Sequence, residues 1–203
     1  METFVSLISV LKGKGVLRNK KVFDAFVKID RRYFVPKDLQ DFAYDATPLP
    51  IGGGQTISQP YTVVFMLELL DVQKGDKVLD VGSGSGYTTA LLSELVGDRG
   101  RVVGVEIIPE LVTLGKKNLS HYHPFYAEIY QSGEEMGRKE EAPYDKILVS
   151  AGSNTIPQEL LKQLKKGGRM VIPIEDGIWK IEKKADDTLN IEKHHGFAFV
   201  PLV

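Results

Sequence analysis

The chain has 203 residues, enough for one large domain, and its 26 basic and 27 acidic side chains leave a formal net charge of −1. With no basic tail and no apolar run near ~18 residues, the composition argues against nucleic acid as the main partner and against a membrane span. Because the chain has no cysteine, disulfides, thiolate metal sites and a cysteine nucleophile are excluded.

The N-terminal part has a helical pattern, followed by a long loop. Apolar residues recur at spacings of three and four in two groups, first Phe4, Leu7, Ile8 and Leu11 and then Val22, Phe23, Phe26 and Val27. We expect two short helices whose apolar faces enter the core. Residues 42–59 are rich in proline, glycine and small polar residues, and a loop this long inside a compact domain is usually disordered or functional. Its aromatic and aliphatic side chains favour an ordered, functional loop.

Strands and helices then alternate. Pro60 stands at a favoured first helical position, and strands are predicted at 77–81, 101–106, 125–131, 146–150 and 168–173. Helices are predicted between them, at 87–96, 109–119 and 156–164, and the tail is predicted to form antiparallel strands at 179–184 and 191–203. This order predicts an α/β fold: a doubly wound, mostly parallel sheet with an N-terminal helical and loop extension and antiparallel C-terminal strands.

We expect a single domain over residues 1–203, in which 1–59 contribute the helices and the loop and 60–203 form the core. The first residues lack the basic and small-residue pattern of a secretory signal, so a cytoplasmic location is expected.

The most specific local pattern is the run VLDVGSGSGY at 78–87. An apolar strand leads into a turn of alternating glycines, which opens a helix. Glycines permit backbone angles closed to other residues and let a ligand lie against bare main chain, while the helix start offers unpaired N–H donors. Glu106 closes the next strand, where its carboxylate can accept hydrogen bonds from two ribose hydroxyls. These features predict a nucleoside cofactor site; a merely structural turn is the alternative.

The spacing narrows the choice of nucleoside. The turn reads G-x-G-x-G instead of the G-x-G-x-x-G of dinucleotide enzymes, and the chain has no G-x-x-x-x-G-K-[ST] loop. S-adenosyl-L-methionine, which carries a sulfonium in place of a pyrophosphate, suits this turn best, so a methyltransferase is the leading interpretation and a dehydrogenase the second. Gly82, Ser83 and Gly84 are the expected turn contacts. Asp80 either accepts a hydrogen bond from the methionine amino group or braces the turn.

Several of these residues are expected on one rim. Ligands of open α/β sheets bind beyond the carboxyl ends of the strands, and Gly82, Gly84, Glu106 and the segments 132–135 and 150–154 all follow predicted strands. None of the four histidines falls on this rim, so we expect solvated or structural roles and no metal site for His121, His123, His194 and His195.

The loop carries a family resemblance. Its run LPIGGGQTISQPY at 49–61 resembles the signature of protein-L-isoaspartate O-methyltransferases, which repair isoaspartyl residues in aged proteins. Other pieces similar to that family follow in the family's order: RYFVP at 32–36, LDVGSGSGY at 79–87, APYD at 142–145, GGRMVIP at 167–173 and FVPLV at 199–203. The resemblance covers nearly the whole chain and is far more specific than the glycine turn.

The resemblance implies S-adenosyl-L-methionine as methyl donor and the α-carboxylate of L-isoaspartyl residues in proteins and peptides as acceptor. Ser58 occupies the family's active-site serine position and is expected to orient the substrate carboxylate; alternatively it only caps the following helix, a contribution of about 1 kcal/mol. Thr56, Ile57 and Gln59 are expected to shape the same pocket through main-chain contacts; a core residue is the alternative for Ile57.

The chain departs from the family pattern after the third strand of the sheet. Family members carry Gly-Asp-Gly there, with the acid near the adenine, whereas this chain has SGEE at 132–135. Glu134 is expected to take the place of the acid with a longer side chain. The departure keeps an alternative open, a catalytically silent or small-molecule-directed homologue that binds S-adenosylmethionine.

Overall fold

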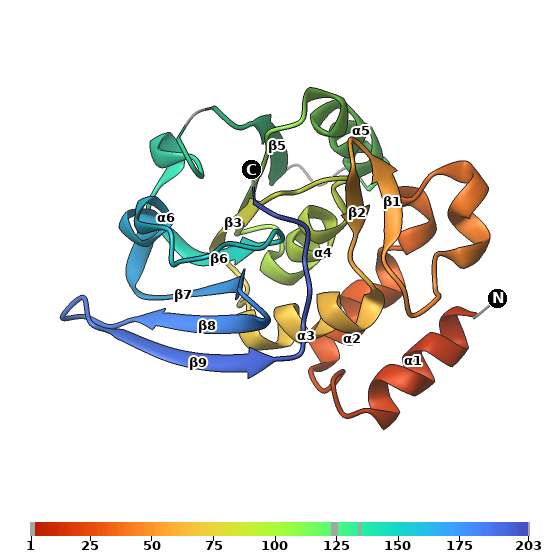
Figure 1. Ribbon diagram of the computed structural model, residues 1–203, viewed down its shortest axis with the longest axis horizontal. Coiled ribbons are helices and arrows are strands. Elements are labelled where there is room, and N and C mark those ends of the chain that lie inside the picture. The colour runs from red at the N-terminus through yellow and green to blue at the C-terminus, as the bar shows by residue number, and fades with distance from the viewer. Residues whose placement is uncertain (1–2, 123–125, 134, 203) are drawn as a thin grey trace.

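A mostly parallel sheet forms the centre of the molecule (Figure 1). The computed structural model describes residues 3–122, 126–133 and 135–202, and within them seven strands form one sheet in the order β5-β4-β3-β6-β7-β8-β9. The first five strands in that order are parallel, and β8 and β9 continue antiparallel. The bounds are β3 Lys77–Val81, β4 Arg101–Glu106, β5 Ala127–Gln131, β6 Tyr144–Val149, β7 Leu164–Ile174, β8 Gly177–Lys183 and β9 Leu189–His195. The predicted fold class is confirmed.

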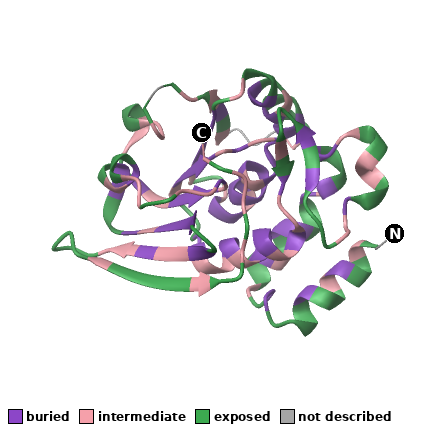
Figure 2. Ribbon diagram, in the orientation of Figure 1, coloured by how far each residue is buried: buried purple, intermediate pink, exposed green. Residues whose placement is uncertain are grey.

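Helices cover both faces of this sheet. The α-helices are α1 Phe4–Gly13, α2 Lys20–Lys28, α3 Pro60–Leu70, α4 Tyr87–Val96, α5 Pro109–Ser120 and α6 Gln158–Gln163, and the short 3-10 helices are η1 Arg31–Phe34, η2 Lys37–Phe42 and η3 Lys139–Glu141. Val78 and Val102 pack into a core with α2 to α5, whereas the adjacent Leu79 and Val103 pack on the other face with Leu160 of α6. Successive strand residues point to opposite faces, so burial on both sides makes the strands almost continuously apolar, as Figure 2 shows in purple.

The local patterns place most elements correctly. β3, β4 and α4 have the predicted bounds, α3 begins at Pro60, and α1 and α2 match the two N-terminal helices. Leu7, Leu11, Val22 and Phe26 are buried as expected. The prediction for Val27 is wrong: its side chain lies on the outer face of α2 and is 53% exposed.

The segment 42–59 is more regular than expected. It contains an antiparallel hairpin of β1 Leu49–Gly52 and β2 Gln55–Ile57. The backbone between these strands has positive φ at Gly53 and Gly54, conformations that glycine adopts without steric cost. The hairpin packs closely on the core, because a Cβ at Gly53 would lie 3.2 Å from the side chain of Ile108 just before α5.

The C-terminal segment corrects the prediction of one long strand over 191–203. β8 and β9 pair antiparallel around a turn at 184–188, as expected, but β9 ends at His195. The chain then turns at Gly196 (φ 91°) and runs back toward the carboxyl end of β6, a path that Figure 1 follows in blue. There the N–H of Gly152 donates to the carbonyl of Val200 (2.7 Å), and the N–H of Leu202 donates to the carbonyl of Gly152 (2.8 Å).

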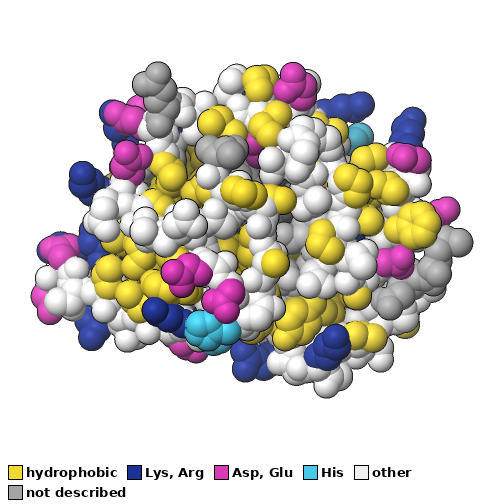
Figure 3. Space-filling model, viewed as in Figure 1, with side chains coloured by type: hydrophobic (Ala, Val, Ile, Leu, Met, Phe, Trp, Pro, Cys, Tyr) yellow, Lys and Arg dark blue, Asp and Glu magenta, His cyan; other side chains and the backbone are white. Residues whose placement is uncertain are grey.

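The surface agrees with the balanced composition. On the face seen in Figure 3, basic and acidic side chains are interspersed over the whole outline. Within the described ranges, no helix is long and apolar enough to cross a membrane.

Candidate active site

A cavity opens at the carboxyl ends of β3, β4 and β6. The strand order reverses at β3, which has β4 on one side and β6 on the other, and ligands of open α/β sheets bind at such a reversal. The cavity walls include the β2 end, the glycine turn, the segments that follow β4, β5 and β6, and the C-terminal segment. Lining residues include Thr56, Ile57, Ser58, Gly82, Ser83, Gly84, Ser85, Glu106, Ser132, Gly133, Ser150, Ala151, Val200, Pro201 and Leu202. The prediction that the strand-end residues share one rim is confirmed for these positions.

Two positions in the glycine turn require glycine, because a larger residue would clash with neighbouring elements. Gly84 has φ 51°, and a Cβ there would lie 3.0 Å from Cδ1 of Ile51 on the hairpin. Gly86 has φ 86°, and its Cβ would lie 2.9 Å from the carbonyl oxygen of Gly115 in α5. The hairpin on one side and α5 on the other therefore fit directly against bare main chain, which leaves the cavity side of the turn open.

Glu106 supports this turn from the neighbouring strand. One carboxylate oxygen accepts from the N–H of Gly84 (2.9 Å), and the other accepts from the N–H of Ile108 (3.0 Å). The residue is 6% exposed and lines the cavity. An ionised carboxylate can accept about four hydrogen bonds, so both oxygens keep capacity for ligand hydroxyls.

Asp80 is fully buried and does not line the cavity. Its Oδ2 accepts from the hydroxyls of Thr88 and Thr89, both at 2.7 Å, so its side chain is turned toward the start of α4. Burial, with a smaller contribution from the negative charge of Glu106, raises the pKa of Asp80 to about 6, although the two hydroxyl bonds oppose the rise. Through Oδ2, Asp80 thus braces the start of α4, whereas its other carboxylate oxygen, Oδ1, has no hydrogen-bond partner among the described residues.

Three buried polar atoms at the turn have no hydrogen-bond partner among the described residues: Oδ1 of Asp80, Oγ of Ser83 and Oγ of Ser85. Buried polar groups in proteins are nearly always paired, and each unpaired one costs free energy. Their grouping within six residues of one turn fits a polar ligand, and so does the open main chain beside them. Ser85 was not among the predicted contacts, although the G-x-G-x-G spacing places it next to Ser83.

Three of the four predicted substrate-site residues line the same cavity, in a part of its wall that we call the substrate wall. Thr56, Ile57 and Ser58 line the cavity from the end of β2. Gln59 does not; it is the N-cap residue of α3, where the chain turns away, and it lines a separate hollow beside α1. Because the N-cap of α3 is Gln59 and no side chain caps it within the described residues, the alternative that Ser58 serves as the helix cap is wrong.

The C-terminal segment supplies wall residues that the sequence analysis missed. Val200, Pro201 and Leu202 line the cavity and add apolar side chains to its wall. Their run belongs to the FVPLV motif, but a strand pattern alone does not indicate a return to the sheet edge. The hydrogen bonds to Gly152 at the end of β6 hold them there.

Other predicted positions lie elsewhere. Glu134 and His123 fall outside the described residues. Glu135 points to the surface and pairs with Lys139. His121, His194 and His195 do not line the cavity. In the part of the chain that the structure describes, no group of three or more His, Cys, Asp or Glu side chains is arranged to hold a metal ion.

Comparison with known proteins identifies the family. The family model described as "Protein-L-isoaspartate(D-aspartate) O-methyltransferase (PCMT)" matches residues 2–203. A protein named protein-L-isoaspartate O-methyltransferase from Methanopyrus kandleri is 48% identical over 97% of this chain and 89% of its own length, and one of the same name from Ignicoccus hospitalis is 43% identical over 97% and 95%.

A solved structure agrees with these relatives. The putative Plasmodium falciparum protein-L-isoaspartate O-methyltransferase, in complex with S-adenosyl-L-homocysteine, superposes with a TM-score of 0.88 at 26% identity over 100% of this chain and 99% of that one. The chain belongs to the protein-L-isoaspartate (D-aspartate) O-methyltransferase family.

Proposed function

We propose that this protein transfers a methyl group from S-adenosyl-L-methionine to the free α-carboxylate of L-isoaspartyl residues in damaged proteins and peptides. One observation carries the proposal: the glycine turn and Glu106 line the same cavity as Thr56, Ile57 and Ser58. A cofactor-binding turn that shares one cavity with the family's loop motif is the arrangement that this reaction requires.

The glycine turn and Glu106 would hold the nucleoside and the amino-acid part of the methyl donor. Glu106 would accept from the ribose hydroxyls, Gly82, Ser83 and Gly84 would contact the donor along the turn, and Asp80 would support the turn. Glu134 remains the predicted neighbour of the adenine. S-adenosyl-L-methionine supplies an electrophilic methyl group on a sulfonium, and the relative from Plasmodium falciparum binds the corresponding product.

The substrate wall has a positioning task, because the nucleophile needs no activation by a base. An α-carboxyl group has a reference pKa of about 3.3–3.7 and is therefore ionised at neutral pH. Ser58 would donate a hydrogen bond to one carboxylate oxygen and leave the other aimed at the methyl carbon. Alignment at near-attack separation is able to lower a barrier by about 7–11 kcal/mol.

Apolar wall residues would exclude water from the reacting atoms. Ile57 and the C-terminal Val200 and Leu202 line the same cavity as Ser58. A carboxylate with less hydration is the better nucleophile toward the sulfonium methyl. The resulting methyl ester loses methanol when the adjacent backbone nitrogen attacks it, and hydrolysis of the succinimide so formed returns some normal aspartate. We place the substrate-binding part in residues 1–59 and the cofactor-binding part in 60–203.

The test is radiolabelled methyl transfer to an isoaspartyl peptide and to the aspartyl peptide of identical sequence. Base-labile label on the isoaspartyl peptide alone is the expected result. Label on both peptides, or binding of S-adenosylhomocysteine without label on either, would contradict the proposed repair activity, and the second outcome describes a silent homologue.

A further inference from the structure

A buried arginine lies directly behind the substrate wall. Arg31, the first residue of η1, is 2% exposed. Its guanidinium donates to three main-chain carbonyls: Nη1 to Ala43, and Nη2 to Ser58 (2.9 Å) and Ile57 (3.4 Å). The neighbouring Arg32 takes the carboxylate of Asp30 as its partner instead.

Burial of the charged Arg31 guanidinium costs free energy. Burial lowers the pKa of Arg31 to about 10, an effect that the nearby Tyr87 and Asp45 oppose, so the group remains protonated at neutral pH. Its Nε is buried with no hydrogen-bond partner among the described residues. A buried charged side chain in a protein rarely has an N–H donor without a hydrogen-bond partner, so the burial of Arg31 requires an explanation.

The positions of two carbonyls that accept hydrogen bonds from Arg31 provide that explanation. The Ile57 carbonyl belongs to the peptide group before Ser58 Cα, and the Ser58 carbonyl belongs to the peptide group after it. A single nitrogen, Nη2, therefore restrains both peptide planes around Ser58. Two restrained planes fix φ and ψ of Ser58, and these angles determine the direction of its Cα–Cβ bond and hence the reach of its hydroxyl.

We propose that Arg31 is a positioning residue for methyl transfer, which holds the Ser58 main chain so that the hydroxyl meets the substrate carboxylate. The inference rests on the proposed function. Arg31 acts from behind the wall and does not line the cavity. A guanidinium suits this task because its planar fork offers several donors in fixed directions, whereas the single ammonium of lysine does not.

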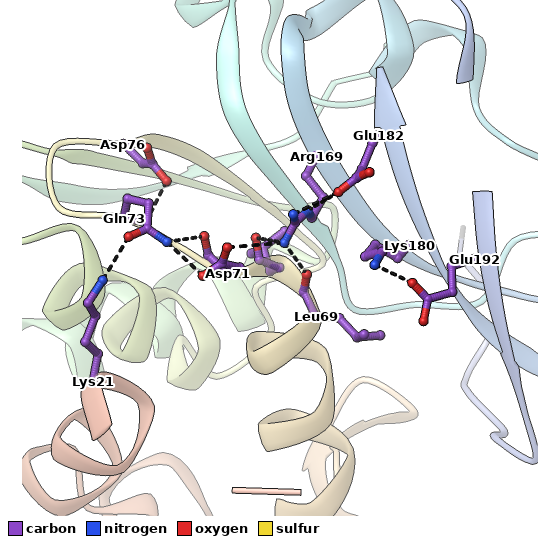
Figure 4. A network of polar contacts seen from close by, with 10 residues as sticks. Lys21, Leu69, Asp71, Gln73, Asp76, Arg169, Lys180, Glu182 and Glu192 are labelled. Atoms are coloured by element: carbon purple, nitrogen blue, oxygen red, sulfur yellow. Dashed lines mark hydrogen bonds and ion pairs between the residues drawn. The ribbon is translucent and has the colours of Figure 1, made fainter. Parts of the chain in front are cut away.

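The chain contains a matched arginine with a purely structural position. Arg169 donates to the carbonyl of Leu69 (2.9 Å), as Figure 4 shows, and to the carbonyl of Leu70 (3.5 Å), both at the C-terminal end of α3. It also pairs with Glu182 at 2.8 Å. Both arginines thus anchor main-chain carbonyls, Arg169 in the last turn of α3 and Arg31 in residues that precede the N-cap of that helix, but of the two only Arg31 holds residues that line the cavity.

The experiment compares Arg31→Ala, Arg31→Lys and Arg169→Ala with the unmodified protein. Thermal unfolding reports stability, calorimetry reports affinity for S-adenosylhomocysteine, and steady-state kinetics with an isoaspartyl peptide separates kcat from KM. We expect Arg31→Ala to lose at least tenfold in kcat with affinity for S-adenosylhomocysteine within twofold. Arg31→Lys should have a kcat between those of the alanine variant and the unmodified protein, and methylguanidinium added to the alanine variant should raise its kcat. The control, Arg169→Ala, should unfold at a lower temperature and keep the kcat of the unmodified protein.

Results that would overturn the positioning role differ from those that would overturn the proposed function. Wild-type kcat in folded Arg31→Ala, or an equal kcat loss in Arg169→Ala, would overturn the positioning role and leave the proposed function intact. If the alanine variant does not fold, an Arg31→Lys protein with unchanged kcat overturns the role as well. Absence of isoaspartyl-dependent methylation in the unmodified protein would instead overturn the proposed function, and this inference with it.

Discussion

Replacement of Gly115 by alanine tests the close fit between α5 and the glycine turn. Gly115 is a buried residue inside α5. A Cβ there would lie 2.9 Å from the carbonyl oxygen of Gly84, 3.0 Å from Cδ1 of Ile129 and 3.4 Å from the N–H nitrogen of Gly86. Two of these three neighbours are main-chain atoms of the turn, which cannot move aside as a flexible side chain would.

Two opposing effects determine the magnitude. Alanine is favoured over glycine inside a helix by about 0.8–1.0 kcal/mol. Insertion of a methyl group into a well-packed region costs about 1–3 kcal/mol. The steric cost exceeds the helix gain, so we expect a net loss of about 1 kcal/mol in the free energy of unfolding, or about 2–4 °C in Tm for a chain of this size. Displacement of Gly84 would also disturb its hydrogen bond to Glu106, with a threefold to tenfold loss of cofactor affinity, or about 1 kcal/mol.

Urea unfolding and calorimetric titration with S-adenosylhomocysteine measure the two effects separately. Gly13→Ala is the matched control, because Gly13 ends α1 and a Cβ there meets nothing within 4 Å. That variant should be as stable as the unmodified protein or slightly more stable, with unchanged affinity. A Gly115→Ala protein that gains stability and binds with wild-type affinity would refute the close contact between α5 and the turn.

Three further predictions address single side chains. Ser58→Ala should lower kcat with little change in affinity for S-adenosylhomocysteine, and equal turnover would remove Ser58 from the mechanism. Glu106→Gln should weaken cofactor binding by about 1–3 kcal/mol in calorimetry, because an amide nitrogen replaces one acceptor and faces an N–H donor. Asp80 has a higher pKa in the folded protein, about 6, than its ordinary value of 3.8, so its contribution to stability is complete below about pH 4 and is lost as the pH rises through 6. Asp80→Asn should therefore gain stability relative to the unmodified protein between pH 4 and 7.5, by up to about 3 kcal/mol, and parallel pH profiles in urea unfolding would contradict the buried carboxyl.

Much of the fold follows from local patterns. Apolar runs of strand length between helical repeats predict β3, β4 and α4 with their bounds, and burial on both faces explains why those strands are nearly continuous in apolar residues. The rim of the site follows as well, because the carboxyl ends of parallel strands lie at one edge of a sheet. Glu106 and the glycines of the turn could be assigned to that edge before any tertiary contact was known.

Contacts between distant segments carry no such local signal. The return of Val200 to the end of β6, the turn of the Asp80 side chain toward Thr88 and the approach of Arg31 to Ser58 each join residues whose own neighbourhoods allow other arrangements. The spacing of apolar residues along a helix or strand indicates which of its faces is buried, but it does not indicate which other segment covers that face. The amino-acid order therefore specifies the elements and the edge at which the ligand binds, whereas packing of the whole chain selects which side chains face the cavity and which support it from behind.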